Sequence, residues 1–254
     1  MQLDPSAASA GVGLITHDAV GSTNTEALNL ARRGERGPLW VTARSQSAGR
    51  GRRGRFWVSE PGNLYASLLL TDPSPPERSA ELSFVAALAV HDAASGRIPG
   101  LDKRLALKWP NDVLIDGCKF AGILIEGEGT SVAIGIGVNC THHPAGTAFP
   151  ATDLAAAGVR ATPESLFAAL SAAMVARLAE WNRGAGFVAI RAGWLDRAAG
   201  LGKSIRVALA EGERVGHFET LDPSGRLVLR LADGSLETIT AGDVMLPSDR
   251  REPA

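Results

Sequence analysis

The sequence predicts an α+β fold in which a sheet with helices is followed by a small all-β unit. With 254 residues, 45% of them hydrophobic, the chain is long enough to bury a substantial core. Up to Gly200, short apolar runs typical of strands alternate with longer segments of helical periodicity. From Ser204 to Leu246 only short alternating runs remain, separated by Gly-containing turns, and this pattern predicts a small β-barrel.

The individual elements follow from local signals. A short strand begins at Leu14–Ile15, and Thr23-x-x-Glu26 has the form of a capping box that opens a helix ending near Gly34. Asp116-Gly117 predicts a tight hairpin turn, and Thr162 before Pro163 predicts a helix start. We expect further strands over 39–43, 63–70, 105–109, 113–115, 121–126 and 131–138, and helices over 77–95, 163–181 and on to Trp194.

Charge and cysteine content exclude several classes of protein. The 26 Lys and Arg residues nearly balance 27 Asp and Glu, so the chain is not a general polycation. No basic segment followed by a long apolar stretch opens the chain, and no segment has the length of a membrane span, so we expect a cytoplasmic protein without membrane contact. Cys118 and Cys140 have no metal-ligand spacing, and we expect both to be reduced and buried.

The most informative segment is the basic loop Gly49–Arg55, which reads Gly-Arg-Gly-Arg-Arg-Gly-Arg and is followed by Trp57. Glycine lets backbone amides approach a ligand closely, and arginine offers fixed charge and a planar donor fork suited to phosphate or carboxylate. The loop is therefore suited to close over an anion. Taken alone, the heptad is equally compatible with a disordered patch that attracts nucleic acid. The neutral overall charge and the single nearby aromatic residue weigh against that alternative.

Four further clusters accompany the basic loop. Polar side chains or strand glycines occur in 22–24 (Ser-Thr-Asn), 108–112 (Lys-Trp-Pro-Asn-Asp), 119–126 (Lys-Phe-Ala-Gly-Ile-Leu-Ile-Glu) and 135–139 (Gly-Ile-Gly-Val-Asn). Each has an ordinary structural explanation as well: helix capping, turn chemistry, a solvated lysine at a strand end, and a bulge, respectively. The glycines in the last cluster are also compatible with a ligand or a second backbone lying against that face of the strand.

The order and joint occurrence of these motifs are more specific than any one of them. From Leu14 to Leu246 the chain resembles the biotin protein ligases, also called biotin–[acetyl-CoA-carboxylase] ligases. The resemblance rests on Ser22-Thr23-Asn24, Gln46 with the basic loop and Trp57, Lys108-Trp109-Pro110-Asn111-Asp112, Lys119-x-Ala121-Gly122-Ile123-Leu124-x-Glu126, and Gly135-x-Gly137-x-Asn139.

The resemblance implies an architecture and a partner. It implies a catalytic domain over 14–200, similar to the class II aminoacyl-tRNA synthetase core, and an SH3-like barrel over 201–248. The catalytic pattern begins so near Met1 that we expect neither the helix-turn-helix domain of some members nor DNA binding. The implied partner is the biotin carboxyl carrier domain of a biotin-dependent carboxylase, and a homodimer is possible.

The resemblance also implies a two-step reaction. Biotin carboxylate attacks the α-phosphate of ATP to give biotinyl-AMP, and an acceptor lysine then takes the biotinyl group, with Mg²⁺ or a similar cation expected. The implied catalytic residues are Arg52, Lys119 and Asp112. The implied biotin-binding residues are Ser22, Thr23, Asn24, Gln46, Gly49, Arg50, Gly51, Arg52, Lys119 and Gly122. Trp57, Asn111, Lys119 and Asn139 are implied to bind ATP or the adenylate.

Two further expectations complete the interpretation. His142 and His143 lack a third ligand at suitable spacing, so we expect no protein-built metal site there. The alternative enzyme is a lipoate–protein ligase, which shares the core fold and reaction plan; the Arg-rich heptad and the Lys-Trp-Pro-Asn-Asp motif favour the biotin enzymes. We also expect residues 45–54 to be mobile without ligand, because four mutually repelling arginines give the loop no preferred conformation.

Overall fold

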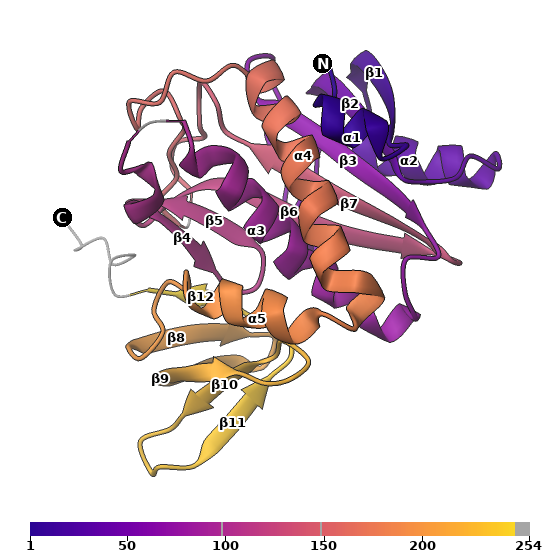
Figure 1. Ribbon diagram of the computed structural model, residues 1–254. Helices are drawn as coiled ribbons and strands as arrows, with labels where there is room; N and C mark the ends of the chain where they lie inside the picture. Colours follow the sequence, from indigo (N-terminus) through magenta and orange to yellow (C-terminus); the bar gives the residue numbers. More distant parts are fainter. Residues whose placement is uncertain (98, 148, 247–254) are drawn as a thin grey trace.

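The computed structural model describes residues 1–97, 99–147 and 149–246, and it contains two sheets (Figure 1). The larger sheet has seven strands in the order β1-β2-β3-β7-β6-β5-β4. Only β1 and β2 pair in parallel; the other neighbours are antiparallel. Its strands are β1 (Gly13–Val20), β2 (Leu39–Gln46), β3 (Leu64–Thr71), β4 (Leu105–Lys108), β5 (Asp112–Ile115), β6 (Cys118–Glu128) and β7 (Ser131–Val138).

Helices cover both faces of this sheet. Figure 1 shows α3 and α4 side by side across one face, where they pack on each other. Helix α2 packs on β2, β3 and β7 from the opposite face. The α-helices are α1 (Pro5–Ser9), α2 (Thr23–Arg32), α3 (Leu82–Ser95), α4 (Pro163–Trp181) and α5 (Phe187–Leu195), and short 3-10 turns are η1 (Arg52–Gly54), η2 (Pro76–Glu81), η3 (Leu101–Lys103) and η4 (Asn182–Gly184).

The alternation of side chains along β2 explains the two layers. Leu39 and Val41 contact the α2 side, whereas Trp40 belongs to the larger core under α3 and α4, where it meets Phe167 edge to face at 5.4 Å. Successive residues of a strand point to opposite faces, so a run of apolar residues at every position marks a strand buried on both sides. The larger core contains most of the buried apolar residues and extends into the second sheet.

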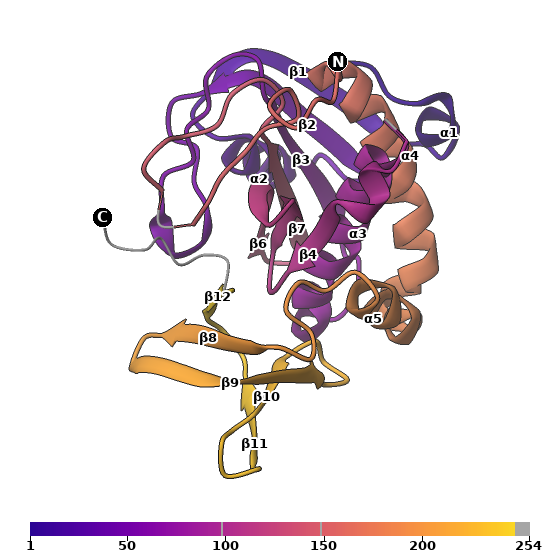
Figure 2. The ribbon, with the colours of Figure 1, turned by 90° about the vertical axis from the view of Figure 1, so that its left-hand side faces the viewer.

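The second sheet is antiparallel, with the order β11-β10-β9-β8-β12. Its strands are β8 (Ser204–Leu209), β9 (Gly212–Leu221), β10 (Leu227–Arg230), β11 (Leu236–Ile239) and β12 (Asp243–Met245). Figure 2 shows it beneath α5. The turn between β9 and β10 contacts the core of the larger sheet directly: the buried Trp109 donates its indole N–H to the carbonyl of Gly225 at 3.0 Å. At φ +81°, Gly225 has a backbone that suits glycine, and an added Cβ would meet Phe84 at 2.8 Å.

Most expected elements are confirmed, some of them to the residue. Strand β7 covers 131–138 as expected, and Asp116 and Gly117 both have positive φ, as a type I′ hairpin turn requires. Helix α4 starts at Pro163 behind a capping box between Thr162 and Ser165. The short strand expected at Leu14–Ile15 is eight residues long, and the helix expected over 77–95 is a 3-10 turn followed by α3.

Two expectations are wrong in detail. Ser22, not Thr23, caps α2, and no side-chain capping bond forms, because the Thr23 hydroxyl faces Gln46 and Ser67 while Glu26 bonds to Asn29. Both cysteines are free, but only Cys140 is buried; Cys118, which follows the Asp116-Gly117 turn, is half-buried. Residues 247 and 248 of the expected barrel lie outside the described residues.

Candidate active site

A cavity of about 340 Å³ lies over strands β5 to β7 and is the candidate active site. A volume of this size suits a small organic ligand. Its wall is built from the start of α2, the basic loop, the strand ends around Asn111 and Asn139, and the first residues of β12. Predicted site residues that line it are Ser22, Thr23, Asn24, Gln46, Arg50, Gly51, Arg52, Trp57, Asn111, Asp112, Lys119, Gly122 and Asn139.

Gly49 is the predicted site residue that lies behind the wall. It is buried, its carbonyl accepts the amide N–H of Trp57, and an added Cβ would lie 2.4 Å from the Ser59 hydroxyl. Close packing within the loop therefore accounts for glycine at this position. The structure gives it no direct access to the cavity.

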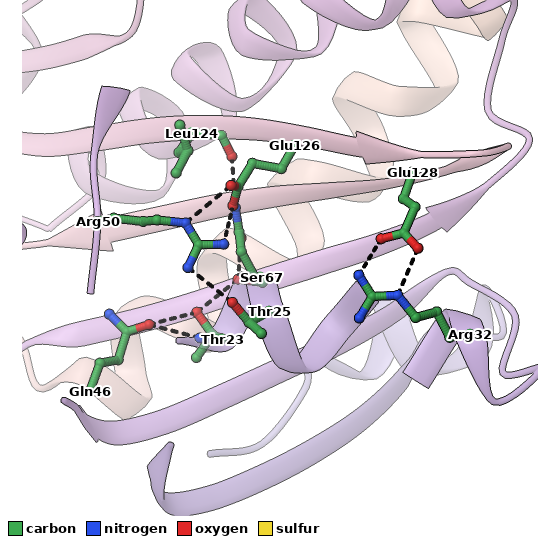
Figure 3. A network of polar contacts seen from close by, with 10 residues as sticks. Thr23, Thr25, Arg32, Gln46, Arg50, Ser67, Leu124, Glu126 and Glu128 are labelled. Carbon is green, nitrogen blue, oxygen red and sulfur yellow. Dashed lines mark hydrogen bonds and ion pairs between the residues drawn. The ribbon is translucent and has the colours of Figure 1, made fainter. Parts of the chain in front are cut away.

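The polar end of the cavity is organised around the N-terminus of α2. The Thr23 amide N–H, which has no partner within its own helix, donates to Oε1 of Gln46 at 2.8 Å. The nitrogen of the Gln46 side-chain amide, Nε2, donates to the Ser59 hydroxyl at 2.9 Å. Both polar ends of Gln46 are thereby fixed. Figure 3 shows how Gln46, from the end of β2, faces Thr23.

Glycines of β6 and β7 make room for side chains of this chain. An added Cβ at Gly135 would lie 2.4 Å from Oδ1 of Asn24, and one at Gly137 would lie 2.7 Å from the Trp57 indole. The β7 register runs without a shift against both neighbours, so the bulge alternative is wrong. The missing side chains let Asn24 and Trp57 lie flat on the sheet.

The other end of the cavity carries opposite charges in contact. Lys119 Nζ lies 2.6 Å from Oδ1 of Asp112, and Arg52 donates to Oδ1 of Asn111 at 3.1 Å. Asn111 in turn donates to the carbonyl of Ile123 at 2.7 Å, which fixes its amide. Burial lowers the pKa of the Arg52 guanidinium, and the charges of Asp243 and Asp112 oppose that shift.

Each arginine of the basic loop has an acidic partner. Asp243, the first residue of β12, is shared by Arg52, Arg53 and Arg55, at 3.8, 3.2 and 2.8 Å. Arg50 pairs with Glu126 on β6. The premise that mutual repulsion leaves the loop without a preferred conformation is therefore wrong. Mobility of residues 45–54 stays a prediction.

Aromatic side chains flank the charged groups. The Trp57 ring centroid lies 5.3 Å from Lys119 Nζ, and no described residue accepts a hydrogen bond from its buried indole N–H. The buried Lys108 lies with its Nζ 3.9 Å from the ring centroid of Phe149. Asn139 lines the cavity, but its amide donates to the carbonyl of Thr152 at 3.0 Å.

Sequence reasoning missed several wall residues. Tyr65, Phe149, Asp243 and Val244 line the cavity, yet none belongs to the motifs that carried the prediction. The signal for Asp243 was weak: a single acidic residue after glycine at the start of a short strand. No pattern near it points to arginines about 190 residues away.

The two histidines make ordinary polar contacts. His142 lies 3.2 Å from the Pro61 carbonyl, and His143 Nδ1 lies 2.6 Å from Asp153. Within the described ranges, no group of three His, Cys, Asp or Glu side chains is placed to hold a metal ion. In the same residues, no helix has the length and apolar character needed to cross a membrane.

Comparisons with known proteins identify the class of this fold and site. The biotin/lipoate A/B protein ligase family matches residues 18–141, and the biotin protein ligase C-terminal domain matches residues 200–246. The fold and the cavity thus define a member of the biotin and lipoate protein ligases.

Relatives and solved structures narrow the class. The biotin–[acetyl-CoA-carboxylase] ligase of Paracoccus denitrificans is 44% identical over 234 residues, covering 88% of this chain and 96% of the relative. The bifunctional ligase/repressor BirA of Bacillus subtilis is 31% identical, covering 93% and 74%. A solved biotin protein ligase from Aquifex aeolicus, in complex with biotin and ATP, matches with TM-score 0.78 at 26% identity, covering 92% and 97%. The chain belongs to the biotin protein ligase family.

Proposed function

We infer that this protein activates biotin with ATP to biotinyl-AMP and transfers the biotinyl group to a lysine of a biotin carboxyl carrier domain. The observation that carries this function is the polarity of the cavity. One end has uncharged donors and acceptors at Thr23 and Gln46, and the other has Arg52 and Lys119. Biotin has the same two-ended character, with a polar ureido ring and a carboxylate tail.

The first step needs two anions to meet. The biotin carboxylate attacks the α-phosphorus of ATP, a new carbon-oxygen-phosphorus link forms, and pyrophosphate leaves. Arg52 and Lys119 offset the repulsion between the reactants and the charge that develops as pyrophosphate departs. Arg50 and Gly51 cover the valeryl chain, and Gly122 permits its close approach. Trp57 stacks on adenine, and Asn111 and Asn139 provide polar contacts to the nucleotide.

The second step needs an uncharged acceptor amine. The lysine nitrogen attacks the carbonyl of biotinyl-AMP, AMP leaves, and the amine loses a proton. Asp112 is the carboxylate beside Lys119 at the charged end of the cavity, and we assign it to orient the amine and take its proton. Lys119 pairs with this carboxylate, so a ligand anion that attracts Lys119 also releases Asp112.

Several finer features belong to the same proposal. Mg²⁺ usually binds through substrate phosphates together with one or two protein carboxylates. Asp112, which lines the cavity beside Lys119, is the carboxylate that would hold the ion here. The larger sheet corresponds to a class II aminoacyl-tRNA synthetase-like domain over 14–200, and the second sheet to an SH3-like barrel over 201–248. The match of the C-terminal domain to residues 200–246 supports that boundary. We place the protein in the cytoplasm, with homodimerisation as a possibility.

One assay tests the assignment. The purified protein should exchange labelled pyrophosphate into ATP only when biotin is present, because adenylation is reversible. With a biotin carboxyl carrier domain added, mass spectrometry should find biotin on one lysine. Exchange that depends on lipoate and not on biotin would replace this function with that of a lipoate–protein ligase.

A further inference from the structure

Glu126 connects three parts of the site that are far apart in the chain. Its Oε1 accepts from Arg50 Nε at 3.1 Å, and its Oε2 accepts from Arg50 Nη2 at 3.0 Å and from Asn24 Nδ2 at 2.7 Å. Arg50 also donates to Thr25 on α2 at 2.9 Å. Figure 3 shows the carboxylate of β6 facing the guanidinium from the basic loop. One carboxylate thus holds the start of α2 and the loop against the same strand.

The carboxylate also determines which way the Asn24 amide points. An ionised carboxylate only accepts hydrogen bonds, so the NH₂ group of Asn24 must face it. The second proton of that NH₂ group goes to the Leu124 carbonyl at 3.3 Å. Oδ1 of Asn24 then faces the hydroxyl of Ser67, 2.6 Å away. An amide oxygen cannot donate, so the single Ser67 proton is directed to Asn24.

The direction of the Ser67 hydrogen bond affects the next hydroxyl oxygen, Oγ1 of Thr23. Ser67 Oγ also lies 2.8 Å from Oγ1 of Thr23. Because the Ser67 proton is used, Ser67 Oγ accepts in that contact. Thr23 Oγ1 also lies 3.1 Å from Oε1 of Gln46, so its single proton is shared between these two acceptors, and its own oxygen is left with lone pairs that can accept. Gln46 Oε1 is meanwhile held by the Thr23 amide. Each link of this chain is buried or half-buried, where an unmatched donor or acceptor is costly.

We propose that Glu126 is a positioning residue for ligand recognition: it fixes the donor and acceptor pattern at the polar end of the cavity and couples that pattern to the basic loop. The proposal rests on the assignment of this end to the ureido group of biotin. Glu126 belongs to one of the motifs on which the family resemblance rests, but neither step of the proposed reaction uses its side chain. Its role is to keep the Thr23 hydroxyl oxygen as an acceptor toward an N–H donor of the ligand.

The chain contains a matched control on the same strand. Glu128, two residues along β6 and on the same face, makes a two-point ion pair with Arg32 at the other end of α2, and Figure 3 shows both pairs. It also joins β6 to α2, but it touches neither Asn24 nor the loop. Glu128→Gln therefore reproduces the loss of a surface ion pair without the change in hydrogen-bond direction.

The experiment compares two ligands in wild type, Glu126→Gln and Glu128→Gln. The ligands are biotin and a biotin analogue in which a ring oxygen replaces one ureido N–H group, so that a donor becomes an acceptor. Their dissociation constants are measured by calorimetry without ATP. The glutamine amide offers both donor and acceptor, so only the longer contact of Asn24 with the Leu124 carbonyl, at 3.3 Å, still opposes a turn of the Asn24 amide. We expect the preference for biotin over the ring-oxygen analogue to fall about tenfold in Glu126→Gln and to change less than about twofold in Glu128→Gln.

A second variant keeps the test decisive if Glu126→Gln does not fold. Ser67→Ala cuts the same chain one link further on and leaves the Arg50–Glu126 pair in place, so it should also reduce the preference for biotin. An unchanged preference in either folded variant would overturn the proposal. A wild-type protein that binds neither ligand would refute the biotin-ligase assignment instead, so the two failures are distinguishable.

Discussion

At the scale of single residues, the proposed function assigns Lys119 a direct electrostatic role in the first step. Its Nζ lies 2.6 Å from Oδ1 of Asp112 and 5.3 Å from the Trp57 ring centroid. Lys119→Ala removes a charge-assisted contact in a closed site, which is worth about 1.5–3 kcal/mol, or roughly one to two decades in rate. We expect that loss in biotin-dependent pyrophosphate exchange, with Lys103→Ala, an exposed lysine of η3, as control. Unchanged exchange would remove Lys119 from the reaction.

For Arg52 we expect a different effect, on retention of the intermediate, because this side chain joins the basic loop to the rest of the cavity wall. Its guanidinium contacts Asn111 and lies 3.4 Å from the Gly242 carbonyl. In Arg52→Gly both contacts are lost and the glycine backbone gains freedom, so biotinyl-AMP should leave the site before transfer. Free adenylate reacts with amines unselectively. Mass spectrometry of a bystander protein such as albumin should then show biotin on many lysines, whereas wild type should leave it unlabelled.

Glu81 provides a pH-dependent prediction outside the site. Burial raises the pKa of its carboxyl, while the indole N–H of Trp181 at 2.6 Å and the charge of Arg78 act in the opposite direction. A raised folded-state pKa means that the folded protein holds the proton more tightly. The stability that this provides is present below the unfolded pKa of about 4.3 and is lost as pH rises through the folded value.

Glutamine stays neutral at every pH, so the Tm of Glu81→Gln relative to wild type should increase as the pH rises above the unfolded pKa of about 4.3. Thermal unfolding followed by circular dichroism at several pH values measures the difference. Glu77→Gln, an exposed position on the same 3-10 turn, should show no such trend. A difference that shrinks with rising pH would show that the favourable contacts outweigh burial.

At the scale of elements, the basic loop is held by two separate carboxylates. Glu126 holds Arg50, and Asp243 holds the arginines around η1. These pairs are half-exposed, so each contributes little alone, and a bound anion adds to them. We expect trypsin to cut after the loop arginines in the free protein, and biotin with ATP to slow that cleavage severalfold. The exposed Arg36, outside the cavity, gives a cut that should not change. Equal loop cleavage in both conditions would mean that the loop does not close over the ligand.

Local sequence patterns predicted the helices, strands and turns more accurately than they predicted the contacts between distant residues. Strand β7 and the Asp116-Gly117 turn depend on alternation and on backbone conformation, both of which are local properties. The start of α2 was misplaced because the Thr23 amide N–H, which has no partner within the helix, is satisfied by Gln46, 23 residues away. Likewise the glycines at 135 and 137 marked a close approach correctly, but only the fold shows that Asn24 and Trp57 are what approaches.

At the scale of the whole molecule, the second sheet completes the site. Nearly all of the predicted residues came together at one cavity because they lie on neighbouring strands of one sheet or in the segments that directly follow those strands. Asp243 could not be foreseen in the same way, since its contact with the basic loop joins residues about 190 positions apart. The two sheets are held together by buried contacts such as Trp109 to Gly225, which fix where β12 begins relative to the loop.

The contact between the second sheet and the basic loop leads to the last prediction, which concerns Asp243. One carboxylate lies among three guanidiniums, so the cluster keeps an excess of positive charge and still attracts phosphate. Asp243→Asn preserves size but removes the charge that gathers the arginines. Loop cleavage by trypsin in the free protein should therefore increase severalfold, and biotinyl-AMP should leave faster, with Asp243→Glu restoring part of both.

Asp233→Asn is the matched control, because Asp233 lies in the β10–β11 turn of the same sheet and bonds only locally to Ser235. It should leave cleavage and adenylate release as in wild type. The Asp243→Asn protein should keep its Tm within a few degrees, because partly exposed ion pairs stabilise little. If Asp243→Asn and Asp233→Asn behave alike in both assays, the second sheet does not hold the loop, and its contact with the basic loop has no part in retaining the intermediate.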